Sequence, residues 1–107
     1  MDIRLIDDIE FRKKWFQMDI GEQMANIGGE VNRAIRWSAK GNEEKSRSFC
    51  NKAKILLQLS IDDPKNRNRR GELCNCIFEL EDRFLGENYY QTSDSVLQKY
   101  YDSFIRY

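Results

Sequence analysis

The chain has 107 residues, and its 18 basic and 18 acidic side chains give a net charge of zero. This length allows one domain with one modest core, so we expect residues 1–107 to form a single helical-bundle domain. The balanced charge argues against a globally basic nucleic-acid-binding protein, the absence of long apolar runs argues against a membrane span, and the absence of histidine excludes His-paired nucleophiles and His-containing metal sites.

The first predicted helix spans about residues 8 to 39. Asp7 and Glu10, three residues apart, form an Asp variant of the capping box that would open it. Lys40-Gly41-Asn42 supplies a cationic last turn and a glycine stop. Apolar residues recur in steps of three and four, which predicts one buried seam made of Phe16, Ile20, Met24, Ile27, Val31 and Ala34.

Two adjacent glycines, Gly28 and Gly29, lie inside this predicted helix. Because a glycine in a helix interior costs about 1 kcal/mol relative to alanine, we expect either a continuous or kinked helix, or two helices separated at Gly28-Gly29. Gly21, Ala25 and Gly28 follow one another in steps of four and three. This small-residue strip would let another backbone approach closely.

The second and third predicted helices meet at Asp62-Asp63-Pro64. Asn42 can cap the second helix, whose inner face contains Phe49, Ala53, Leu56, Leu57 and Ser60. Asp63 is expected to cap the third, because proline suits the first helical position and disfavours helix in the residue before it. The third helix should end at Gly86, and its apolar residues are Leu73, Cys76, Ile77, Leu80, Phe84 and Leu85.

A final helix is predicted after a short loop, with Thr92 or Ser93 as its cap. Its apolar residues are Val96, Leu97, Tyr100, Tyr101, Phe104 and Ile105. No stretch of the chain alternates between apolar and polar residues, so no sheet is expected. Four amphipathic helices with short connections predict an all-α, antiparallel four-helix bundle.

The three cysteines, Cys50, Cys74 and Cys76, are expected to be ordinary buried or half-buried thiols. Two residues turn a helix by roughly 200°, so Cys74 and Cys76 cannot easily hold one ion together. An odd cysteine count without an apolar leader segment fits a cytoplasmic protein rather than a disulfide framework. We expect no cofactor and no metal.

A cluster of basic residues follows Pro64 and is the first candidate binding site: Lys65, Arg67, Arg69 and Arg70. Cations at a helix N-terminus are electrostatically misplaced, and together with the backbone N–H groups they could bind an anion, a nucleotide or a nucleic acid. The alternative is that these side chains pair with neighbouring carboxylates such as Asp62, Asp63 and Glu72. The local excess of one positive charge favours that alternative.

The aromatic residues are the second candidate, as a surface for self-association. A four-helix domain of this size can bury only some of them, and exposed aromatic clusters mark interfaces. The predicted interface residues are Trp15, Trp37, Tyr89, Tyr90, Tyr100 and Tyr101, with Phe16 and Tyr107 in the wider set.

A polar side of the first helix is the third candidate. Asp19, Glu22 and Asn26 share it, and such sides are usually solvated, although Asp19 and Glu22 could also pair with Arg36 or Arg70. A carboxylate-bridged metal site of the di-iron type needs Glu-x-x-His pairs, so that version is absent.

Several strings resemble a group of small uncharacterised bacterial helical-bundle proteins: residues 15–37 followed by Gly41-Asn42, residues 59–67, and Gly71 to Cys74. That group in turn resembles the HEPN superfamily, whose members often accompany minimal nucleotidyltransferases, and the resemblance covers roughly residues 10 to 105. Active HEPN ribonucleases carry an Arg followed after four to six residues by a His, usually at a dimer interface. Here Asn75 stands at the matching distance from Arg70, so the resemblance implies a non-catalytic member in which only Arg70 carries over.

Two functions from different classes follow from the sequence. The first is a non-enzymatic cytoplasmic interaction or regulatory protein, homodimeric and able to bind a partner such as a nucleotidyltransferase-like protein. The second is a nucleotide- or nucleic-acid-binding protein that uses the basic cluster. A histidine-free hydrolase using Arg70 and carboxylates is the least favoured, because no side chain supplies a base tuned near neutrality.

Overall fold

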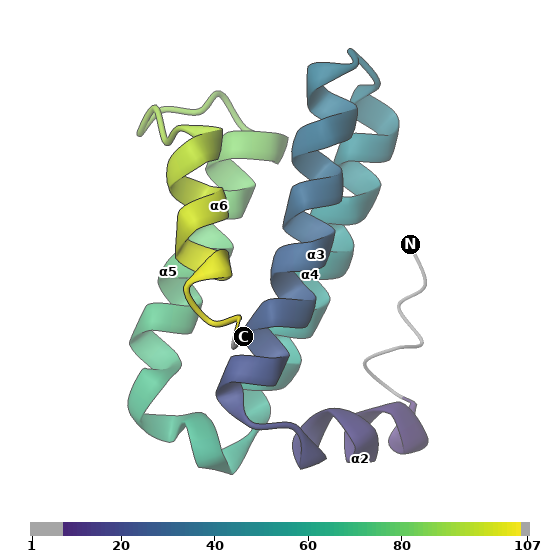
Figure 1. The fold of residues 1–107 in the computed structure, drawn as a ribbon, viewed down its shortest axis with the longest axis vertical. Coiled ribbons are helices and arrows are strands. Elements are labelled where there is room, and N and C mark those ends of the chain that lie inside the picture. The colour runs from purple at the N-terminus through teal and green to yellow at the C-terminus, as the bar shows by residue number, and fades with distance from the viewer. Residues whose placement is uncertain (1–7, 106–107) are drawn as a thin grey trace.

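The fold, taken from a computed structural model that describes residues 8–105, consists of helices and connecting loops over that range, with no strand. Four helices lie side by side: α3 (Ile20–Ala39), α4 (Glu43–Asp62), α5 (Arg70–Leu80) and α6 (Asp94–Asp102). The chain reverses direction between each helix and the next, and α2 (Ile9–Gln17) lies across one end (Figure 1). The all-α prediction is therefore confirmed.

Two short helical segments flank α5. The 3₁₀ segment η1 (Pro64–Arg69) leads into it, and the π-helical turn η2 (Glu81–Leu85) continues it as far as Gly86. The third predicted helix thus begins and ends where the sequence placed it. Asp63 caps its start as predicted, accepting a hydrogen bond from the backbone N–H of Lys65 at 3.0 Å.

The side chains that cap the other helices explain where those helices begin. Asn42 caps α4 as predicted, and Ser93, one of the two predicted candidates, caps α6. Each accepts a backbone hydrogen bond at 3.1 Å. The cap of α2 is Asp8, which accepts from the backbone N–H of Phe11. The capping-box prediction is therefore wrong by one position, and Asp7 itself lies outside the described residues.

The break in the first predicted helix is not at Gly28-Gly29 but at Met18-Asp19, where α2 ends and α3 begins. Met18 is extended, with ψ of 145°, and Asp19 caps α3 by accepting from the backbone N–H of Glu22 at 2.8 Å. A carboxylate at this point can satisfy the first free N–H groups of a new helix. Both glycines continue α3 without interruption.

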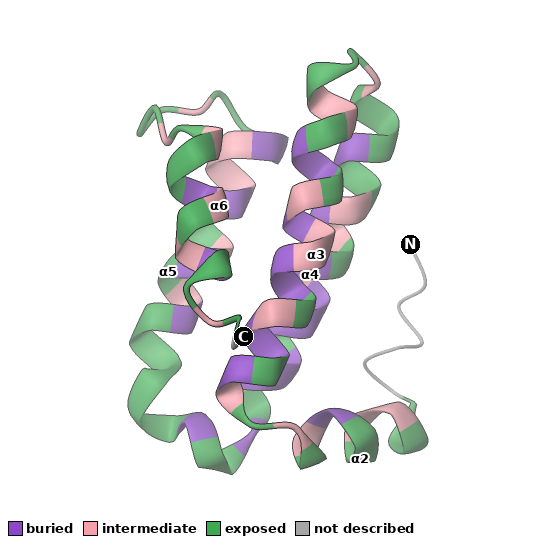
Figure 2. Ribbon diagram, viewed as in Figure 1, coloured by how far each residue is buried: buried purple, intermediate pink, exposed green. Residues whose placement is uncertain are grey.

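The core lies along the seam between α3 and α4 and extends to α5 and α6 (Figure 2). Four of the six predicted seam residues, Met24, Ile27, Val31 and Ala34, are completely buried, while Phe16 and Ile20 at the α2–α3 end are half-buried. The inner face of α4 is also confirmed, with Ala53, Leu56, Leu57 and Ser60 buried and Phe49 half-buried.

The small-residue strip on α3 receives α6. A Cβ atom on Gly28 would lie only 2.7 Å from the Cβ of Tyr101, so only glycine permits this approach. Gly29 is different, because the nearest side-chain atom to its Cβ position is Arg33 Nη1 at 3.6 Å. Of the two glycines, Gly28 is therefore the one that the packing of α6 requires.

The thiols behave as predicted, since Cys50 and Cys76 are buried and Cys74 is half-buried, all three free. Burial raises the pKa of Cys50 to about 12, and burial also raises the pKa of Cys76. Cys76 Sγ lies 3.5 Å from the Tyr100 hydroxyl, which donates to the Glu72 carboxylate and so connects α6 to α5. Thiols protonated this firmly are poor nucleophiles.

No helix within residues 8–105 is both long and apolar enough to cross a membrane.

Candidate functional site

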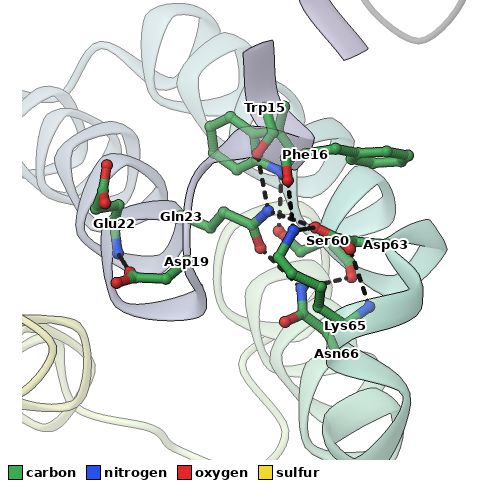
Figure 3. A network of polar contacts seen from close by, with 9 residues as sticks. All are labelled: Trp15, Phe16, Asp19, Glu22, Gln23, Ser60, Asp63, Lys65 and Asn66. Carbon is green, nitrogen blue, oxygen red and sulfur yellow. Dashed lines mark hydrogen bonds and ion pairs between the residues drawn. The ribbon is translucent and has the colours of Figure 1, made fainter. Parts of the chain in front are cut away.

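A buried polar network joins α2, α3, α4 and η1 at one end of the molecule (Figure 3). Gln23 is at its centre and is completely buried. Its Nε2 donates to the backbone carbonyl of Trp15 and to Asp63 Oδ2, both at 3.0 Å. Its Oε1 accepts from Asn66 Nδ2 at 2.8 Å.

The remaining members complete the network from α4 and η1. Ser60 Oγ accepts from the indole N–H of Trp15 at 3.1 Å, and the Ser60 carbonyl accepts from Asn66 Nδ2 at 2.9 Å. Buried polar groups satisfied by one another fix the geometry of a junction and leave little capacity for a ligand. We therefore assign this network a structural role.

Asp63 is the charged group of this network. Burial alone would raise the pKa of its carboxyl, but hydrogen bonds from the Lys65 ammonium, the Lys65 backbone N–H and Gln23 outweigh it and lower the pKa below the ordinary value. The Lys65 ammonium lies 2.7 Å from Asp63 Oδ2 and also donates to the backbone carbonyl of Phe16. Lys65 therefore joins η1 to the end of α2.

This lowered pKa makes part of the stability depend on pH. A carboxyl group with a lowered folded pKa stabilises the fold above its unfolded pKa and loses that contribution as the pH falls through the folded value. We expect the urea midpoint of the wild type to exceed that of Asp63→Asn by a constant amount from pH 7 to about pH 5, and the gap to close progressively at lower pH. Urea titrations of both proteins across this range measure it, and a gap unaffected by acid would contradict the assignment.

The basic residues that follow Pro64 are largely paired within the fold, in agreement with the alternative that they bond to neighbouring groups of the chain. Lys65 pairs with Asp63, and Arg69 pairs with Glu72 at 3.3 Å. Arg70 Nε donates to the carbonyl of Ile61 at 3.1 Å, which closes the end of α4. Arg67 makes no hydrogen bond or ion pair with the described residues. Three of the four basic side chains are therefore engaged within the chain.

The polar side of α3 is solvated, as expected for such a surface. Glu22 and Asn26 are exposed, and within the described chain neither Asp19 nor Glu22 pairs with Arg36 or Arg70. No group of three or more Cys, Asp or Glu side chains within residues 8–105 is arranged to hold a metal ion.

The predicted aromatic interface is wrong for two of its six residues. Trp15 is 3% exposed and Tyr101 is 2% exposed, because the network holds the first and the Gly28 contact holds the second. Two others, Trp37 and Tyr100, are half-buried, and the ammonium groups of Lys40 and Lys45 lie over the Trp37 ring. Tyr107 lies outside the described residues.

Tyr89 and Tyr90 are the remaining predicted interface residues, and both are exposed, at 81% and 74%. Five of the seven exposed large hydrophobic residues in the described chain fall between residues 78 and 96. These five, which we name the exposed apolar set, are Phe78, Leu85, Tyr89, Tyr90 and Val96. The loop before α6 and the outer side of α6 are largely exposed in Figure 2.

Sequence periodicity missed Phe78 entirely and grouped Leu85 and Val96 with the apolar residues of the third and the final predicted helices. Val96 lies on the outer side of α6. The buried residues of this short helix are Leu97 and Tyr101, which form the narrow stripe that it presents to α3. Leu85 belongs to the π-helical turn, whose wider spacing moves residues away from the stripe that an α-helix would continue. The sequence did contain a signal for the exposure of Phe78, because this apolar residue lies outside the apolar stripe of its helix.

The loop that carries the two tyrosines is held by Asp82. The Asp82 carboxylate accepts hydrogen bonds from the backbone N–H groups of Tyr89 at 2.7 Å and Tyr90 at 3.0 Å. The backbone carbonyl of Asp82 accepts a third from the backbone N–H of Asn88 at 2.8 Å. Asn88 has a positive φ of 52°, which asparagine tolerates better than most residues, and its side chain accepts from the Thr92 N–H. The exposed rings also contact each other edge to face, with centroids 5.3 Å apart. Two exposed aromatic rings on an ordered loop form a pre-organised contact surface.

We expect Asp82→Ala to loosen this loop without unfolding the protein. The two amides lose a charged acceptor, so their hydrogen exchange should accelerate by roughly tenfold or more, since hydrogen bonds to charged groups contribute about 1.5–3 kcal/mol. Exchange measured amide by amide reports this, and core amides of α3 should keep their rates. Asp102→Ala, which removes an exposed carboxylate from α6, is the matched control. Unchanged exchange at Tyr89 and Tyr90 would show that Asp82 does not order the loop.

A comparison of the chain with family models, with curated proteins and with solved structures gives no significant match in any of the three.

Proposed function

We propose that this protein is a non-enzymatic helical interaction protein that works as a homodimer. The observation that carries the proposal is the ordered loop that holds Tyr89 and Tyr90 exposed, together with the rest of the exposed apolar set. Tyrosine is enriched among the residues that dominate binding energy at interfaces, and clustered exposed apolar residues mark contact surfaces.

The chemistry of the side chains supports a non-enzymatic role. The sequence has no histidine, two of the three thiols have raised pKa values, and the buried polar groups around Gln23 bond to one another. Under the resemblance to HEPN proteins, the molecule is a HEPN-like antiparallel four-helix bundle without catalytic machinery. Arg70, the only residue that carries over, is bonded to the end of α4, and Asn75 cannot transfer a proton. A nucleotidyltransferase-like protein is the partner that this resemblance favours.

We place this function in the cytoplasm. Three free cysteines without a disulfide among the described residues fit a reducing compartment.

The oligomeric state tests the proposal. Light scattering coupled to size exclusion, run over a series of protein concentrations, should give a mass approaching twice 12.8 kDa as concentration rises. A mass of one chain throughout the micromolar range and into the millimolar range would overturn the homodimer.

The alternative function is anion binding at η1, as a nucleotide- or nucleic-acid-binding HEPN-like protein. Arg67 favours it, because this guanidinium has no partner in the described chain while its three basic neighbours are engaged. The alternative predicts binding to RNA, DNA or nucleotides that weakens with salt and is lost in Arg67→Glu. Absence of binding at low salt would remove it.

A further inference from the structure

The outer face of α5 is an exposed stripe without charged side chains. Gly71, Asn75 and Phe78 follow one another in steps of four and three, so they lie on one face of the helix, and all three are exposed. Phe78 is 66% exposed. Cys74 lies beside them, since it is three residues after Gly71 and four before Phe78. In a chain in which 34% of the residues are charged, an uncharged stripe around an exposed ring is suited to contact with another protein surface.

The stripe contains both a protrusion and a flat place. A Cβ atom on Gly71 would meet nothing within 4 Å, so packing within the described chain does not require glycine there, although a helix prefers almost any other residue. Phe78 follows seven residues later, about 10 Å further along the helix. The chain uses the same combination internally, where the missing side chain of Gly28 makes room for Tyr101. Gly71 therefore leaves room for an aromatic ring from outside the chain.

A second copy can supply that ring twice over. In a two-fold dimer, a residue that contacts another across the axis is contacted by it in return. If two α5 helices lie antiparallel with the axis between Cys74 and Asn75, Phe78 of each copy faces Gly71 of the other. A parallel pair would instead place ring against ring and leave both glycines open.

The charges at the two ends of α5 also favour an antiparallel copy. Basic residues precede the helix and acidic residues end it: Arg67, Arg69 and Arg70 against Glu79, Glu81 and Asp82. This arrangement opposes the helix dipole, whereas an antiparallel neighbour brings the basic start of one helix beside the acidic end of the other. Arg67 and Glu79 make no hydrogen bond or ion pair with the described residues, so one charge of each sign is available for this contact.

The tyrosine loop lies at the acidic end of the same stripe. Asp82, four residues after Phe78, accepts from the backbone N–H groups of Tyr89 and Tyr90. Figure 1 shows this loop at one end of α5 and η1, which carries Arg67, at the other. The antiparallel arrangement thus brings the exposed rings of one copy toward a guanidinium of the other, and such a pair is favourable.

We propose that two copies pair through antiparallel α5 helices, with Phe78 of each packed on Gly71 of the other and the two Cys74 side chains facing each other at the axis. This inference rests on the proposed homodimer and names its contact surface. One helix and one loop from each copy bury less than the roughly 1,600 Å² of a standard interface, so we expect a micromolar dissociation constant.

The thiol of Cys74 reports the register directly. Cys50 and Cys76 are buried and Cys74 is half-buried, so a short bismaleimide reaches Cys74 first. At concentrations where the wild type is dimeric, a denaturing gel should show most of the protein linked as a covalent dimer, and Cys74→Ser should abolish the link. The matched control is Cys74→Ser with Ser48→Cys, which moves the thiol to an exposed position on α4. It should link no more than monomeric protein does at high dilution.

Two substitutions test the ring and the glycine separately. Phe78→Ser should raise the dissociation constant measured by sedimentation roughly thirtyfold or more, as expected for a central aromatic residue of an interface. Gly71→Gln should weaken association to a similar extent, yet leave the melting temperature of the dilute monomer unchanged or higher, because helices prefer glutamine to glycine. Ile9→Ser, which removes an equally exposed apolar side chain (67%) from α2, should leave the dissociation constant unchanged. Circular dichroism checks that each variant is folded.

The outcomes separate this contact from the homodimer itself. A wild-type dimer that does not link through Cys74, or that Phe78→Ser leaves intact, would show that α5 is not the contact, and the homodimer proposal would stand. If the wild type never dimerises, the homodimer proposal fails and the α5 contact fails with it.

Discussion

Replacing Gln23 by leucine is expected to destabilise the fold by about 3 kcal/mol, although the two side chains are similar in size. Gln23 is completely buried and makes three hydrogen bonds, one to α2, one to η1 and one to the residue between α4 and η1. The substitution leaves the Asp63 carboxylate, the Asn66 amide and the Trp15 carbonyl each one partner short, and a buried polar group left unsatisfied costs about 1–3 kcal/mol. Each of these groups keeps one other partner, namely Lys65, the Ser60 carbonyl and the Met18 N–H. The expected loss of stability is therefore smaller than three full penalties.

Chemical denaturation of this variant and a matched one measures the effect. Gln58→Leu removes an exposed glutamine from α4 whose side chain, among the described residues, bonds only to Asp62. The free energy of unfolding of this variant should differ from that of the wild type by less than about 0.5 kcal/mol. Equal effects for the two substitutions would show that the buried network contributes nothing specific to stability.

Replacing Gly28 by alanine is expected to destabilise the protein by about 1–3 kcal/mol, because the new methyl group overlaps Tyr101 and overpacking of a core costs this much. The atom that it meets is Tyr101 Cβ, which cannot move without moving the backbone of α6. The strain should therefore appear as faster hydrogen exchange in α6 and a lower melting temperature.

We expect the opposite change in stability for the same substitution at the neighbouring Gly29. Gly29→Ala places its methyl group where the nearest side-chain atom is 3.6 Å away, so the usual preference of helices for alanine should stabilise the protein by up to about 1 kcal/mol. Thermal unfolding of the two variants should shift in opposite directions from the wild type. A stabilising Gly28→Ala would mean that α6 does not pack against α3 as closely as the fold requires.

Local chemistry that depends on a few neighbouring residues could be read from the sequence. Asn42, Asp63 and Ser93 cap helices because their side chains reach N–H groups two or three residues ahead. The seam from Met24 to Ala34 follows from the period of the α-helix. The end of the third helix follows from Gly86.

The candidate surface was predicted less well, because burial of an aromatic side chain depends on distant partners. Trp15 is in the core because Ser60 accepts its indole N–H from 45 residues away, and Tyr101 is there because Gly28 makes room for it. Conversely, Phe78 is 66% exposed, and the only sequence signal for this was its position outside the apolar stripe of α5.

The sequence by itself determined that residues 8–105 fold into amphipathic helices and where most of them begin and end, since capping and periodicity act over one or two turns. Only the tertiary structure decided that Gly28 is the contact point for α6 and that Tyr89 and Tyr90 remain exposed. These outcomes depend on which helices lie against each other, and packing between segments far apart in the chain leaves no pattern within either segment.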